Sequence, residues 1–314
     1  MSDQIVPRGR ELTFNIIFTP GSFAYLKFLL PGMLNRLTCS FRLAANGCSR
    51  EETAAMTDCC KRFDRLEFHQ LPFTGMVPHG KALNHLQKME RTDYFCFMDP
   101  DIVVTHNFLS GLLPALAGQA AVFSGRPVWQ ETDSDILPEG ENRLMGRYCR
   151  TAGGLLLGSS YFGIYRNPVL NRFIEKQGFC FERFSWPELP PRASLLLVKT
   201  GLAANYYDTA KVLNILLQEQ GAGLCYHDTP GLLHIGGLSC NILSRGKLTR
   251  REDLSMERSL KRKLSVHLLQ WLHALLNARP LPSMPAGNHP EIHKKIARLK
   301  RQITEDYHAY KDRF

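Results

Sequence analysis

The feature that most constrains this chain is a short apolar run that ends in two carboxylates. Residues Tyr94–Met98 (YFCFM) are aromatic-rich and bounded by polar residues, which indicates a buried β-strand. Asp99 and Asp101 follow at once, with Pro100 stiffening the turn between them. Hard divalent cations take oxygen ligands, and Mg²⁺ uses one or two carboxylates together with substrate phosphates. The pattern favours a metal site over the alternative, in which the acids only cap the next helix.

Strands and helices alternate along the first third of the chain. Ser49 and Glu52 have the spacing of a capping box, which marks the start of one of these helices. Such alternation predicts an α/β domain with a mixed, mostly parallel sheet and helices on both faces. The expected strands are Thr13–Phe18, Phe41–Ala45, Leu66–Leu71 and Tyr94–Met98, and the expected helices are Phe23–Leu37, Arg50–Phe63 and Lys81–Arg91.

Three polar clusters fall where expected strands end: Thr19-Pro20-Gly21, Asn46-Gly47 and Asp99-Pro100-Asp101. Ligands of such sheets bind outside the carboxyl ends of the strands, so these clusters predict one shared site. Further along, strands are expected at Ala120–Ser124, Gly158–Tyr165 and Leu232–Ile235, the last of which contains His234. A helix is expected from Asp208 to Gln220.

The segment HGKALNHLQKMERTDYFCFMDPD resembles the GT-A glycosyltransferases, especially an inverting family with many bacterial polysaccharide enzymes. Gly80, Lys81, Ala82 and Asn84 match the start of that family's helix, and Asp99 and Asp101 match its metal motif. The resemblance follows the order of elements over residues 13–238 and is specific over residues 79–104. It implies a Rossmann-like GT-A domain over residues 1–244, with a donor half to about 125 and an acceptor half from about 126.

The resemblance also implies roles for individual residues. Thr19, Pro20 and Asn46 would contact the nucleoside of a nucleotide-diphosphate sugar, although the family often has an acid where this chain has Asn46. His234 would join Asp99 and Asp101 in binding Mn²⁺ or Mg²⁺, since imidazole suits Mn²⁺-like metals; a core histidine is the alternative. Asp208 would take the proton from the acceptor hydroxyl, or would merely cap its helix, and Glu188 is the rival base.

Other side chains are weaker candidates. Lys81 and Arg126 could bind the diphosphate, and are equally well explained as surface cations. Four aromatic residues could stack on a sugar but are more often part of a core: Trp129, Tyr161, Trp186 and Tyr206.

The C-terminal segment, residues 245–314, is expected to be a basic helical extension. It holds 16 Lys/Arg against 7 Asp/Glu, so it carries most of the net charge of +10. Residues 255–276 form an amphipathic pattern that packing on the protein itself explains better than a membrane foot. Homo-oligomer formation stays open, and the basic residues lack a nucleic-acid recognition motif. The lack of a signal peptide, with nine cysteines and no C-x-x-C pair, favours the cytoplasm.

The function predicted from sequence is transfer of a sugar from a nucleotide-diphosphate donor to a hydroxyl of a small-molecule, glycan or lipid-linked acceptor. Inversion at the anomeric carbon is favoured, and a retaining enzyme is the near alternative. A nucleotidyltransferase is disfavoured, because Thr19-Pro20-Gly21 is too short for a glycine-rich phosphate loop. A non-catalytic adaptor would not explain both carboxylates of the DPD triplet.

Overall fold

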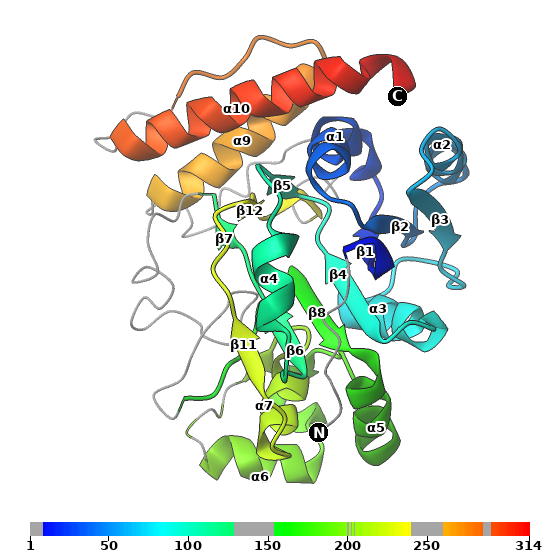
Figure 1. The fold of residues 1–314 in the computed structure, drawn as a ribbon, viewed down its shortest axis with the longest axis vertical. Coiled ribbons are helices and arrows are strands. Elements are labelled where there is room, and N and C mark those ends of the chain that lie inside the picture. The colour runs from blue at the N-terminus through cyan, green and yellow to red at the C-terminus, as the bar shows by residue number, and fades with distance from the viewer. Residues whose placement is uncertain are drawn as a thin grey trace.

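The computed structural model describes residues 9–128, 154–199, 201, 203, 205–239, 260–284 and 290–314. Its centre is a seven-stranded sheet in the order β11-β6-β8-β4-β1-β2-β3 (Figure 1). The strands are β1 (Thr13–Phe18), β2 (Ser40–Ala45), β3 (Leu66–Gln70), β4 (Tyr94–Met98), β6 (Ala121–Phe123), β8 (Phe162–Arg166) and β11 (Leu224–Tyr226).

All pairings in this sheet are parallel except those of β8, which runs antiparallel to both β4 and β6. The prediction of a mixed, mostly parallel sheet is therefore confirmed. Parallel strands need long crossovers, and the helices supply them.

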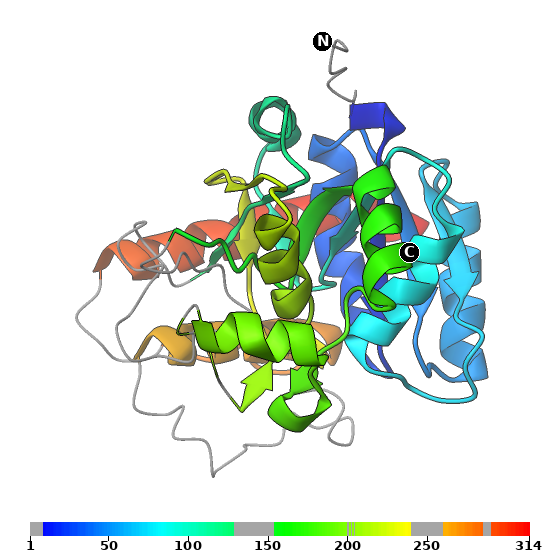
Figure 2. The ribbon, with the colours of Figure 1, turned by 90° about the horizontal axis from the view of Figure 1, so that it is seen from below.

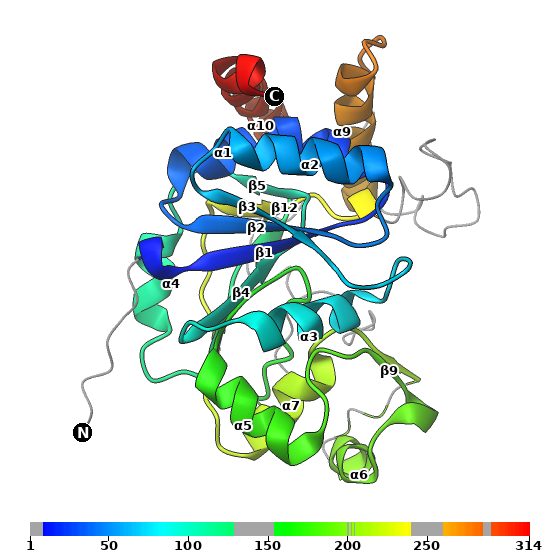
Figure 3. The ribbon, with the colours of Figure 1, turned by 90° about the vertical axis from the view of Figure 1, so that its right-hand side faces the viewer.

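Helices cover both faces of the sheet, as Figure 3 shows in layers. Side chains alternate along each strand, so Phe14, Ile16 and Phe18 of β1 pack toward one face while Ile17 packs toward the other. The first face is covered by α1 (Leu26–Arg36), α2 (Arg50–Lys61) and α4 (Leu109–Ala115). The second is covered by α3 (His79–Met89), α5 (Asn167–Gln177), α6 (Pro191–Lys199) and α7 (Lys211–Glu219).

Two small sheets complete the chain's described strands. One has the order β5-β12-β7, built from Ile102–Val104, Leu232–His234 and Arg126–Pro127. The other pairs β9 (Phe184–Ser185) with β10 (Tyr206–Tyr207). The first matters for the site, because β5 follows the DPD triplet directly.

The C-terminal extension contains α9 (Leu260–Leu276) and α10 (Pro290–Tyr310), which lie over α1 at one end of the molecule (Figure 1). Figure 2 views the molecule from the opposite end, where α6 lies. Leu264, Leu268 and Leu272 of α9 are buried together with Phe28 of α1 and Ile235. The expected apolar stripe is thus packed on the protein itself. None of the described helices is long and apolar enough to cross a membrane.

Several predicted boundaries differ from those observed, and two of the differences bear on the site. The strand expected from Gly158 begins at Phe162, because Gly158 has a φ of +66° that no strand adopts. The helix expected to begin at Asp208 begins at Lys211, because Ala210 before it takes a left-handed φ of 66°. Asp208 therefore lies in a turn before the helix.

Candidate functional site

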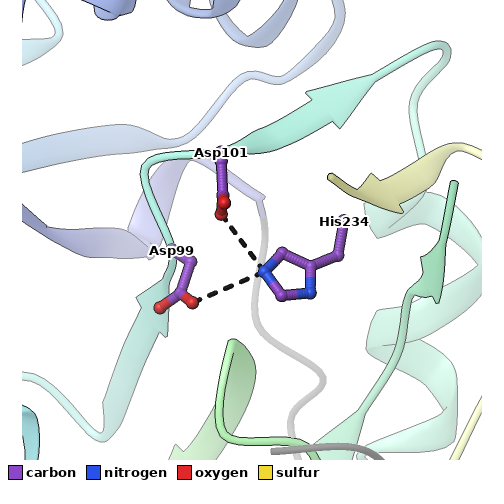
Figure 4. Close-up of side chains that lie close together, drawn as sticks. All are labelled: Asp99, Asp101 and His234. Carbon is purple, nitrogen blue, oxygen red and sulfur yellow. Dashed lines mark ion pairs between the residues drawn. The ribbon is translucent and has the colours of Figure 1, made fainter. Parts of the chain in front are cut away.

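Asp99, Asp101 and His234 converge at the carboxyl end of β4. In the β5–β12 ladder His234 lies opposite Ile102, the residue after Asp101. This register brings the imidazole to the DPD triplet although the two are far apart in the sequence. Nε2 of His234 is 3.1 Å from Oδ1 of Asp101 and 3.6 Å from Oδ2 of Asp99 (Figure 4).

The three ligand atoms have the spacing that a divalent cation requires. They lie within 4.8 Å of one another, and an ion about 2.1 Å from each of three atoms places those atoms about 3 to 4 Å apart. Nε2 of His234 is buried and faces oxygens of both carboxylates at ion-pair distance. Two carboxylates and an imidazole that converge in this way form a donor set that fits a divalent metal ion.

Electrostatics also couples the three groups. Burial lowers the pKa of His234, but Asp101 and Asp99 outweigh that effect and raise the pKa to about 10. Burial works to raise the pKa of Asp101, while His234 and the Leu238 N–H lower it, and the net pKa is below the usual value. The carboxylates therefore attract positive charge to this point, whether proton or metal.

The backbone holds both carboxylates in place. Oδ2 of Asp101 accepts the Leu238 N–H at 3.0 Å, which leaves Oδ1 directed at His234. The Asp99 N–H donates to the Tyr161 carbonyl at 2.8 Å. The ring of Tyr161 stacks on the His234 imidazole with centroids 4.2 Å apart, so it fixes the plane of that ring.

Two residues at the site were missed or misjudged from the sequence. His79, the first residue of α3, has its Nε2 3.8 Å from Oδ1 of Asp99. It stands directly before Gly80 in the helix motif, which was the available signal. Tyr161 was considered only as a sugar-stacking side chain, whereas its ring lies on His234.

The residues expected to contact the nucleoside lie at the carboxyl ends of β1 and β2. Thr19 is buried, and its Oγ1 has no hydrogen-bond partner in the part of the chain that the structure describes. The Asn46 side chain donates to the Val77 carbonyl and accepts the Val77 N–H, both at 2.9 Å. Next to it, a Cβ on Gly47 would lie 2.6 Å from the Met76 nitrogen, so glycine permits this close approach. Contact of Thr19, Pro20 and Asn46 with a base stays a prediction.

The two cations proposed for the diphosphate have protein contacts. Arg126, beside the site through the β7–β12 pairing, forms a forked ion pair with Asp228. The Lys81 ammonium lies 5.1 Å from the centre of the Phe73 ring and lines a pocket between α3 and the segment that carries β9. A role of either in phosphate binding is not tested by these contacts.

Asp208 is linked to the metal centre through one short segment. Its Oδ1 accepts the Thr209 N–H at 2.8 Å and its Oδ2 accepts the Ser160 hydroxyl at 3.3 Å. Ser160 precedes Tyr161, whose carbonyl and ring hold Asp99 and His234. The helix-start argument for Asp208 no longer applies, but its position beside the site keeps it a candidate base. The rival Glu188 caps its own turn by accepting from the Ser185 N–H and hydroxyl.

Of the aromatic candidates, Trp186 packs against Tyr207 with centroids 6.4 Å apart, and Tyr206 lines the pocket. Trp129 lies outside the described residues.

Comparison with known proteins finds likeness only at the level of structure. No protein-family model matches the chain, and no curated protein matches it. A galactosyltransferase, LgtC, in complex with donor and acceptor sugar analogues, is 12% identical, covers 96% of this chain and 100% of its own, and has a TM-score of 0.43. The mannosyltransferase PcManGT from Pyrobaculum calidifontis, in complex with GDP-Man and Mn²⁺, is 11% identical over 92% of this chain and 69% of its own, with a TM-score of 0.45.

A third structure, described as a glucose-1-phosphate thymidylyltransferase from Bacillus anthracis, is 11% identical over 81% of this chain and 95% of its own, with a TM-score of 0.41. At these identities and TM-scores the matches carry no argument about activity. The function of this chain is therefore inferred from its own site.

Proposed function

We propose that this protein is a GT-A-type glycosyltransferase that transfers a sugar from a nucleotide-diphosphate donor to a hydroxyl acceptor, with a divalent metal ion bound by Asp99, Asp101 and His234. The observation that carries the proposal is the buried Nε2 of His234 directed between two carboxylates, with ligand atoms of all three residues within 4.8 Å of one another. Its position at the carboxyl edge of a mostly parallel sheet is where such folds bind ligands.

In this proposal, different residues of the site would bind different parts of the donor. A bound divalent cation would neutralise the charge that develops on the departing diphosphate. Thr19 and Pro20 would meet the nucleoside, and the buried Oγ1 of Thr19, which has no partner among the described residues, supports a polar contact there. His79, beside Asp99, would donate a hydrogen bond to a phosphate oxygen.

In the inverting form of the proposal, Asp208 is the general base. The acceptor oxygen bonds to the anomeric carbon while the bond from that carbon to the diphosphate oxygen breaks, and the acceptor's proton passes to the Asp208 carboxylate. Asp208→Asn is then expected to lower kcat by about a hundredfold or more. The anomeric configuration of the product, read by NMR, separates inversion from retention, and a retained configuration would remove this role.

The first test is calorimetric titration of the full chain with UDP, GDP, dTDP and ADP, with and without Mn²⁺. We expect one nucleotide to bind only with metal, and its binding to be lost in Asp99→Ala/Asp101→Ala. Asp58→Asn is the matched control, because Asp58 is exposed and pairs only locally with Lys61. A folded wild-type chain that binds none of the four nucleotides would favour the non-catalytic alternative.

A further inference from the structure

A pocket of about 900 Å³ lies between residues of α3 and the segment that carries β9. Pro78 lines it, and the next residue is His79, which lies beside Asp99. Tyr206 also lines it, two residues before Asp208. The lining thus lies within two residues of both His79 and the candidate base, which favours this pocket as the place for an acceptor. Its volume suits a ligand of several sugar rings.

The cations of the pocket come from two opposing walls. Lys81 and Lys88 are seven residues apart on α3, so both lie on one face of this helix, two turns apart. Arg183 belongs to the segment just before β9, on the other side of the pocket. In the described part of the chain none of these three is within salt-bridge distance of a carboxylate, although the Arg183 charge works to lower the pKa values of Glu188 and Tyr206. Lys88 and Arg183 are exposed at the pocket's surface.

The carboxylates of the pocket, by contrast, already accept hydrogen bonds from neighbouring residues of the protein. Glu182 accepts from the Asn84 side chain and, at 2.6 Å, from the Cys180 N–H. Glu188 accepts from the Ser185 N–H and hydroxyl, and these bonds lower its pKa. His85 adds no further positive charge, since burial and then Lys88 lower its pKa. The hydrogen-bond donors left for a ligand are cationic, while the acceptor atoms of the acids are largely used.

We propose that this pocket binds the acceptor and selects glycans that carry an anionic group, a phosphate, sulfate or carboxylate, held by Lys88 and Arg183. The rings of Phe73 and Tyr206 give the pocket aromatic surface for the apolar faces of sugar rings. This inference rests on the proposed glycosyltransferase function and names its class of acceptor.

In the test, the full chain is first saturated with Mn²⁺ and with the nucleotide that it binds most tightly. It is then mixed with a library of oligosaccharides in matched neutral, carboxylated, sulfated and phosphorylated forms. Native mass spectrometry reports which members bind. At least one anionic form is expected to bind about tenfold more tightly than its neutral match, as two charge-assisted hydrogen bonds allow. The three anionic arms show which group is preferred.

Lys88→Gln/Arg183→Gln is expected to abolish this preference while leaving the nucleotide's Kd unchanged. Lys61→Gln, on α2 across the sheet, is the matched control and should retain it. Equal binding of neutral and anionic forms, binding of no library member, or a preference that survives the double substitution would overturn the inference. Failure of the nucleotide to bind would instead count against the proposed function, so the two failures are distinguishable.

Discussion

At the scale of single residues, Tyr161 makes a close ring contact with His234 of the proposed metal site. Its ring is stacked 4.2 Å from the His234 imidazole, and its hydroxyl donates to the Gly125 carbonyl at 2.8 Å. Residues that orient a ligand histidine, without touching the metal, commonly change metal affinity by about 10- to 100-fold when they are replaced. The contact thus assigns Tyr161 a positioning role.

Tyr161→Leu removes the stacked ring and is expected to weaken Mn²⁺ binding by about tenfold, because the imidazole is then free to turn away from Asp101. Tyr161→Phe keeps the ring and loses the hydroxyl with its bond to the Gly125 carbonyl, which Tyr226 also contacts at 3.0 Å. Its Mn²⁺ affinity should stay close to that of the wild type. Electron paramagnetic resonance of free Mn²⁺ measures the Mn²⁺ affinity of each variant. Equal affinity in the Leu and Phe variants would show that stacking does not position His234.

At the scale of elements, local signals were enough to predict most of the parallel half of the sheet. The capping box that starts α2 is present, with Glu52 accepting from the Ser49 N–H and Ser49 from the Glu52 N–H. The Glu52 carboxylate also accepts a hydrogen bond from the Gly21 N–H at 2.6 Å, a contact that no local sequence pattern predicts. Non-local pairings set the rest: the antiparallel insertion of β8 and the β5–β12 ladder depend on segments far apart in sequence.

The candidate site divides in the same way. Asp99, Asp101 and His234 could be predicted because their chemistry is visible in short motifs, and the structure brings all three together. His79 was missed: its place directly before Gly80 was a signal, but only the 3.8 Å distance to Asp99 shows that it lies at the site. The start of α7 was misplaced because Ala210, an ordinary helix former, adopts a left-handed conformation that its residue type does not predict.

The pairing of α9 with α10 is expected to be sensitive to pH. Nε2 of the buried His267 on α9 lies 2.6 Å from the Lys300 ammonium on α10 and must be unprotonated to accept a hydrogen bond from it. Burial, Lys300 and His293 lower the pKa of His267 to about 4. An unfolded histidine has a pKa of about 6.5, so below that pH the unfolded chain binds a proton that the folded chain excludes. Stability from this contact is full above pH 6.5 and is lost as the pH falls toward 4.

His267→Gln removes the titration and keeps a hydrogen-bond acceptor for Lys300. Between pH 7 and pH 5 the wild-type free energy of unfolding should fall by about 2 kcal/mol more than that of the variant. Urea unfolding followed by tryptophan fluorescence measures this, since Trp271 lies 5.5 Å below the Lys300 ammonium. Identical pH dependence in both proteins would show that His267 is not excluded from protonation.

At the scale of the whole molecule, the C-terminal extension is joined to the domain that holds the site. Its helices share a buried cluster with Val103 of β5 and Leu233 of β12, the two strands that carry the chain away from Asp101 and into His234. The Gln302 side chain of α10 also donates to the Thr105 carbonyl at 3.1 Å. Residues 245–314 are distinct in charge, but α9 and α10 pack against the strands on either side of the Asp99, Asp101 and His234 cluster.

This packing predicts that the extension and the site unfold together. Arg36 of α1 forms a forked pair with Asp306 of α10 at 2.7 and 3.0 Å, and Asp306 is 8% exposed. Asp306→Asn leaves the Arg36 charge without its partner and should lower the free energy of unfolding by about 2 kcal/mol, somewhat less than for a fully buried pair. Asp312→Asn, at an exposed position in the same tail, should change little.

The informative measurement follows urea unfolding by circular dichroism and by release of bound Mn²⁺ in the same samples. If the helices stabilise the strands on either side of Asp101 and His234, both signals change in one transition, and Asp306→Asn shifts both to lower urea by the same amount. If α9 and α10 instead unfold first, circular dichroism will show an early step that Asp306→Asn moves alone while Mn²⁺ release stays in place. That result would show that α9 and α10 do not stabilise the strands on either side of Asp101 and His234.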